Sequence, residues 1–165
     1  MIAIKIKNTK AFMSKLLTKE LFDEFFLVEA TIDTYNTFHI DGLVHKDFYK
    51  YDDTFAEVLK DKYSKWAVIK PIALDLIKGK RTPLGFKFIL QLDEKLKNTM
   101  IKEAETDILP DQVALGLNIR FSNEELILTS GISYEIFTLD KSLEKAWDDY
   151  LPRFLSDSEI DNEIM

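Results

Sequence analysis

Cysteine is absent from the 165-residue chain, which excludes disulfides, thiolate zinc sites, iron–sulfur clusters and cysteine nucleophiles. The absence fits a reducing compartment. Long apolar runs are missing too, since no stretch reaches the roughly 18 residues that a membrane-spanning helix needs. The opening MIAIKIKNTK alternates apolar and basic residues, so it lacks the apolar centre of a signal peptide. We therefore expect a cytoplasmic protein that makes no contact with a membrane.

Glycine and proline are scarce, at five and four residues, so we expect most of the chain to form helices and strands. Phenylalanine is abundant instead, and the twelve Phe residues predict a core rich in aromatic packing. The length is typical of a single globular domain, which we expect to cover residues 1–155. The segment 156–165, SDSEIDNEIM, carries four acids and is expected to be an acidic, mobile tail.

Hydrophobic periodicity predicts an α+β fold, built from a mainly antiparallel sheet with four to five helices. Helices are expected over 8–19, 53–63, 71–78, 94–104 and 141–154. Strands are expected over 2–6, 27–33, 34–40, 43–49, 66–69, 84–92, 114–121, 126–129 and 132–139. Asp41-Gly42 predicts a hairpin turn between two strands, and Ser130-Gly131 predicts another turn. Pro71 is expected in the first turn of its helix, where proline is favoured.

Two resemblances bear on the fold. The runs FLVEATIDTYNTFHIDGLVHKDFY, IKPIALDLIKGKRTPLGFKF and LNIRF…IFTLDKSLEKAWDDYLPRFL resemble those of a bacterial family of unknown function, which implies no particular activity. The order strand–helix–strands appears twice, over pseudo-repeats 1–60 and 61–140, and is similar in topology to one domain of a DNA sliding clamp. The second resemblance implies association with DNA, and several copies would be needed to encircle a duplex. No clamp-specific motif accompanies it, and topology alone does not fix function.

Charge is distributed unevenly along the chain. The formal net charge is −7, yet residues 60–87 carry eight cations and two acids. Within this basic segment, Lys78, Lys80 and Arg81 follow a predicted helix and are the candidate anion-binding residues. They can hold the phosphates of nucleic acid or of a small ligand. Alternatively, they only complement the negative end of the helix dipole. Three further lysines of the segment can extend the patch: Lys65, Lys70 and Lys87.

Catalytic and metal-binding signatures are not found. His39 and His45 have metal-ligand chemistry, but neither geometry of this segment brings them together. A single straight strand separates them by about 20 Å, and a turn at Asp41-Gly42 puts them on opposite faces of a hairpin. No serine lies in a G-x-S-x-G motif, and the single glycine of the 78–83 segment cannot form a phosphate-binding P-loop. We therefore expect no metal and no cofactor. Four aromatic residues can stack on bases, or they can be core or edge residues of the fold: Trp66, Tyr35, Tyr49 and Tyr63.

The sequence favours a non-enzymatic, cytoplasmic binding or accessory protein. Its partner is either another protein or nucleic acid bound through the basic segment 60–87. Two alternatives stay open. One is a clamp-like, DNA-associated protein, and the other is an enzyme or small-ligand protein that acts on a phosphorylated compound. A further hypothesis is that the acidic tail 156–165 covers the basic loop.

Overall fold

A sheet of seven strands forms the frame of the molecule. The computed structural model describes all 165 residues and gives the strand order β3-β2-β4-β5-β6-β1-β7, with every neighbouring pair antiparallel. The strands are β1 (Ala3–Ile6), β2 (Phe26–Asp33), β3 (Thr37–Asp41), β4 (Gly85–Gln91), β5 (Val113–Ser122), β6 (Glu125–Tyr134) and β7 (Asn162–Ile164). The helices are α1 (Thr9–Thr18), α2 (Trp66–Ile77), α3 (Glu94–Ala104) and α4 (Ser142–Asp157). The predicted α+β class with a mainly antiparallel sheet is confirmed.

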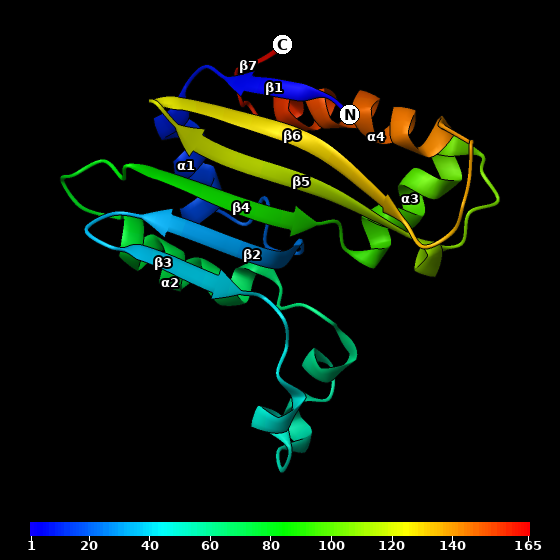
Figure 1. Cartoon of the computed structure of the whole chain (residues 1–165), viewed down its shortest axis with the longest axis horizontal. Helices are drawn as coiled ribbons and strands as arrows, with labels where there is room; N and C mark the ends of the chain where they lie inside the picture. Colours follow the sequence, from blue (N-terminus) through cyan, green and yellow to red (C-terminus); the bar gives the residue numbers. More distant parts are fainter.

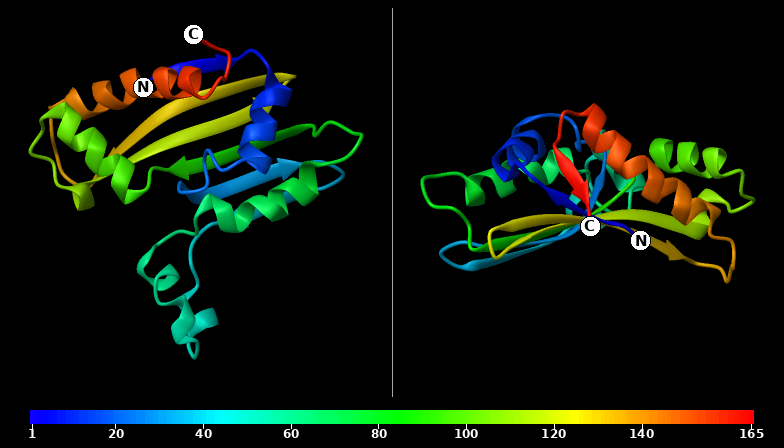
Figure 2. Two further views of the ribbon diagram at one scale, coloured as in Figure 1. Left: turned by 180° about the vertical axis from the view of Figure 1, so that it is seen from behind. Right: turned by 90° about the horizontal axis from the view of Figure 1, so that it is seen from above.

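All four helices lie on one side of the sheet, and the other side is left open (Figures 1 and 2). Successive side chains of a strand point to opposite faces of the sheet, and the apolar ones point to the face that the helices cover. In β5, Leu115, Leu117 and Ile119 are buried under the helices, whereas Asn118 and Arg120 point to the open face. The core therefore occupies the layer between helices and sheet, and polar side chains of the strands gather on the uncovered face.

The helix α4 covers strands β5 and β6 through one apolar stripe. Its buried residues recur at intervals of four: Leu143, Trp147, Leu151 and Leu155. The Trp147 indole Nε1 donates a hydrogen bond of 2.9 Å to the carbonyl of Gly116, which fixes the helix on β5. None of the helices has the length and apolar character that crossing a membrane requires.

Four sequence predictions differ from the structure, and the first concerns residues 66–69. They form the start of α2 rather than a strand, because Trp66 is fully buried and its Nε1 donates to the Leu16 carbonyl at 2.9 Å. Pro71 consequently lies inside α2. It is tolerated because Ala67, whose carbonyl loses a partner, is exposed to water. The second pseudo-repeat, 61–140, thus has no opening strand.

The second difference is the hairpin. β3 turns back from β2 at residues 34–36, where the Thr34 amide donates to the Asn36 carbonyl, and Asp41-Gly42 is not a turn. Gly42 serves a close approach instead, because an added Cβ would lie 1.7 Å from the Leu27 carbonyl oxygen. Beyond it, residues 43–63 form an arm that projects from the body (Figure 1). The expected strand 43–49 and helix 53–63 are replaced there by three short 3₁₀ turns: Lys46–Tyr49, Asp53–Phe55 and Val58–Lys60.

The third and fourth differences lie near the C-terminus. Ser130-Gly131 is not a turn but the middle of β6, because the Ser130 hydroxyl is buried and bonds to Asp148 on α4. The segment 156–165, expected to be a mobile tail, ends in β7, which pairs with β1, and Ile160 is buried. β7 is the edge strand farthest from β3, so the acidic segment does not cover the basic loop.

Candidate anion-binding site

The loop that joins α2 to β4 carries the three predicted anion-binding residues. Lys78 ends α2, and its amide donates to the Leu74 carbonyl at 2.8 Å. Gly79 follows with φ 129°, a conformation that side chains rarely allow, and this residue turns the chain away from the helix. Lys80 and Arg81 are exposed. Only Lys78 of the three forms an ion pair, at 2.8 Å from Asp75, so Lys80 and Arg81 are free to contact a ligand.

Most of the other lysines of the basic segment lie away from the loop, including Lys62, which lies in the arm with its Nζ over the Tyr63 ring. Lys60, Lys65 and Lys70 form ion pairs with Glu57, Glu24 and Asp23. Lys65 immediately precedes α2 and Lys70 lies in its first half, whereas the basic loop follows its C-terminal end, and Lys60 lies in the arm. The expected extension of the patch through Lys65 and Lys70 is therefore not found, whereas Lys87 does lie near the loop.

Sheet pairing adds a residue that the sequence did not indicate. Lys87 on β4 is directly opposite Arg120 on β5, and both side chains are exposed on the open face. Neither has an acidic partner within salt-bridge distance. Two cations opposite each other on a sheet repel, and a bound anion would relieve that repulsion. The alternation in LNIRF places Arg120 on the open face, but the register that pairs it with Lys87 is not readable from sequence.

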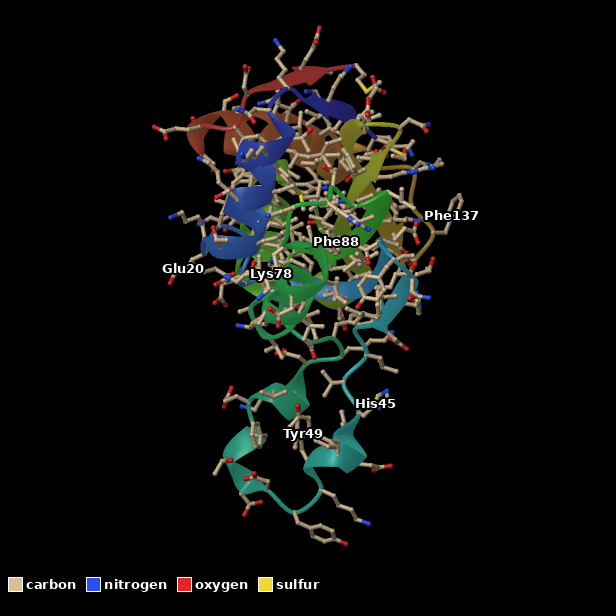
Figure 3. The ribbon with its side chains drawn as sticks, turned by 90° about the vertical axis from the view of Figure 1, so that its left-hand side faces the viewer. Glu20, His45, Tyr49, Lys78, Phe88 and Phe137 are labelled. Atoms are coloured by element: carbon tan, nitrogen blue, oxygen red, sulfur yellow. The ribbon has the colours of Figure 1, made fainter.

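Two neighbouring depressions bring these cations together. One, of about 560 Å³, lies on the open face and contains Lys87 and Arg120. The other, of about 480 Å³, contains Lys78, Lys80 and Arg81. The two depressions share three lining residues: Thr34, Tyr35 and Leu84. We call this part of the molecule the basic end, defined by Lys78, Lys80, Arg81, Lys87 and Arg120. Figure 3 views it directly, with Lys78 labelled at the surface.

An exposed aromatic ring lies between the two groups of cations. Tyr35 lines both depressions and is 80% exposed. The Tyr35 and Phe38 rings pack edge-to-face, with centroids 5.4 Å apart. This contact positions the Tyr35 ring, and most of the ring still meets solvent. The two acids that line the depressions have partners within the protein, because Asp33 accepts a hydrogen bond from Thr37 at 2.7 Å and Asp75 is paired with Lys78. Glu124, in the turn beside Asn123, is exposed and has no cationic partner. The basic end thus combines positive charge with a stacking surface.

The two histidines are placed apart from each other, and only His39 lies near the basic end, in one cross-strand row with Lys87 and Arg120. His39 lies on β3 beside Thr31, with its Nδ1 3.3 Å from the Thr31 hydroxyl. His45 lies at the base of the arm (Figure 3). No group of three or more His, Asp or Glu side chains is arranged to hold a metal ion.

The chain belongs to DUF5721, a family of unknown function, whose family model matches residues 15–163. No curated protein and no solved structure matches the chain. The resemblance to a family of unknown function is therefore confirmed, and the likeness to a sliding-clamp domain stays a prediction.

Proposed function

We propose that the protein binds single-stranded nucleic acid at the basic end, as a non-enzymatic binding or accessory protein of the cytoplasm. The observation that carries the proposal is the pair Lys87 and Arg120, which lie opposite each other on an uncovered sheet face without an acidic partner. Lys80 and Arg81 extend the positive surface around the end of the sheet. A chain of phosphates suits such a surface, because it meets several cations in succession.

The exposed Tyr35 ring favours a single strand over a duplex. Bases of a single strand are free to stack on aromatic side chains, which contributes about 1–3 kcal/mol per base, whereas bases of a duplex are already stacked. Tyr35 lies between the depression of Lys87 and Arg120 and that of Lys80 and Arg81. A base on Tyr35 would therefore have phosphates directed to cations on both sides. Readout of this kind depends little on base identity.

Fluorescence anisotropy with labelled single-stranded DNA and RNA, and with a duplex of the same length, tests the proposal. We expect salt-dependent binding that is tighter for the single strands. The double variant Lys80→Ala/Arg81→Ala and the double variant Lys87→Ala/Arg120→Ala should each weaken it. Loss of two phosphate contacts should make the negative slope of log K against log salt shallower by about 1.4.

The matched control is Lys46→Ala/Lys50→Ala, which removes two exposed cations from the arm and changes the net charge equally. This control should bind as tightly as the native chain. Tyr35→Ala should weaken binding to single strands while leaving the salt slope unchanged. Absence of binding at low salt would refute the proposal. A loss of affinity in the arm variant as large as that in the basic-end variants would also refute it.

A further inference from the structure

The two ends of the central strands carry opposite charge. The strands β4, β5 and β6 run from the basic end to the opposite end of the sheet. The turn at residues 123–124 lies at the basic end, and Val113 and Tyr134 lie at the opposite end. A strand of ten residues separates these ends by roughly 33 Å. Beyond Val113 and Tyr134 lie two loops, 105–112 and 135–141, which we call the acidic end. Its acids are Glu105, Asp107, Asp111, Glu135 and Asp140.

The acidic end carries one cation, Lys141, and this residue pairs with Glu144 at 3.4 Å. Hydrogen bonds from the Ser142 amide and the Thr106 hydroxyl hold the pKa of Asp140 below its usual value. This carboxylate therefore keeps its charge to a lower pH than an ordinary Asp does. Across the two loops, acids outnumber cations.

The two loops of the acidic end are joined to each other. The Thr106 hydroxyl donates to Asp140 at 2.9 Å, and the Glu135 amide donates to the Gln112 carbonyl at 2.8 Å. Ile108 is buried and anchors the first loop to the core. Residues from both loops are therefore presented as one surface with a fixed shape.

This surface is apolar as well as acidic. Phe137 is 90% exposed and Leu139 is 81% exposed, and Leu109 of the other loop is also exposed. Phe137 stands clear of the body in Figure 3. Large apolar side chains gathered on a rigid, charged surface are typical of a protein interface. The basic end has a matching composition, because Leu84 and Tyr35 are exposed among its cations.

We infer that copies of this chain associate head to tail, with the basic end of one copy docked on the acidic end of the next. The ends are complementary in charge, and each offers exposed apolar side chains to the other. Because the two docking surfaces differ, a head-to-tail dimer still has one free basic end and one free acidic end. Further copies can therefore add to it. The net charge of −7 makes two copies repel each other on average, so contacts between ends of opposite charge are favoured over other orientations. An interface made of loops is small, and contacts below about 1,200 Å² are typical of weak, reversible association.

Sedimentation velocity over a range of protein and salt concentrations tests the inference. The native chain should form species larger than a dimer at high concentration and low salt, and these should dissociate as salt rises. Two variants each disable one end. Lys80→Glu/Arg81→Glu disables the basic end, and Phe137→Ser/Leu139→Ser disables the acidic end without altering a buried residue.

Each variant alone should be a monomer. An equimolar mixture should form a dimer and nothing larger, because only one competent end of each kind remains. The arm variant Lys46→Glu/Lys50→Glu changes the charge equally and should associate as the native chain does. A native chain that stays monomeric at low salt, or variants that do not form the mixed dimer, would overturn the inference. Nucleic-acid binding is measured separately on Phe137→Ser/Leu139→Ser, which keeps the basic end, so failure of one proposal is distinguished from failure of the other.

Discussion

Asn123 and Glu124 form the two-residue turn between β5 and β6, and both have positive φ values, 52° and 64°. A turn of this type favours asparagine followed by glycine, because a side chain with positive φ is strained. Glu124 is therefore unfavourable for stability. It also places a carboxylate in the turn at the basic end, next to Asn123, which lines the same depression as Arg120.

Substitution of Glu124 should separate these two effects. We expect Glu124→Gly to raise the free energy of unfolding by about 0.5–1 kcal/mol and to strengthen binding of a single strand at low salt. Glu124→Ala should strengthen binding similarly without the gain in stability, because alanine keeps the strained backbone. Urea unfolding and anisotropy measure the two quantities. A Gly variant no more stable than the Ala variant would contradict this account of the turn.

Residue identity alone revealed part of the candidate site. Lys78, Lys80 and Arg81 follow one another in the chain and were visible in the sequence, as was the uneven charge. Arg120 was not, because it lies outside the basic segment and meets Lys87 only through the register of β4 and β5. The ion pairs of Lys65 and Lys70 could not be foreseen either, since Glu24 and Asp23 are more than forty positions away.

Among the elements, the strands β4 and β5 follow their sequence patterns, whereas β6, α2 and the arm do not follow theirs. A short apolar run such as WAVI fits either a strand or a buried helical turn, and the contact of Trp66 with Leu16 decides for the helix. Asp-Gly usually marks a turn, but Gly42 is needed for its lack of a side chain beside Leu27. In both cases a contact between distant segments overrides the local preference.

The arm is an element that adds little to the core. None of the residues in its three 3₁₀ turns is buried, and Phe48 and Tyr51 are 84% and 93% exposed. At its base the Val44 amide donates to the Lys62 carbonyl at 2.9 Å. Val44 and Lys62, at the two ends of the arm, are therefore close enough to be joined by a short hairpin turn.

Removal of the arm should leave the body folded. We expect a chain in which Asn-Gly replaces residues 45–61 to unfold within a few degrees of the native thermal midpoint, since no core side chain is removed. It should also bind a single strand as the native chain does, because the basic end is intact. Calorimetry and anisotropy check these outcomes. Loss of cooperative unfolding would show that the arm supports the body.

For the whole molecule, the two proposals share the same cations. Lys80 and Arg81 cannot contact the phosphates of a strand and the carboxylates of a neighbouring copy at once. We therefore expect an unlabelled oligonucleotide to dissociate head-to-tail assemblies of the native chain into single copies bound to the oligonucleotide. Sedimentation with absorbance at 260 and 280 nm follows both components (approximately the absorption maxima of bases and of aromatic side chains). Assemblies that retain their size while binding the oligonucleotide would contradict a shared surface.

The position of β1 has a consequence for the time course of folding. β1 pairs only with β6 and β7, through contacts such as Ala3 with Thr129 and Ile4 with Ile164. During synthesis the first strand must therefore wait for more than a hundred further residues before either partner exists. Pairings of such long sequence separation close slowly. Ile4 and Ile6, which are buried in the finished fold, stay exposed during that interval, and the emerging chain depends on rapid completion to avoid aggregation.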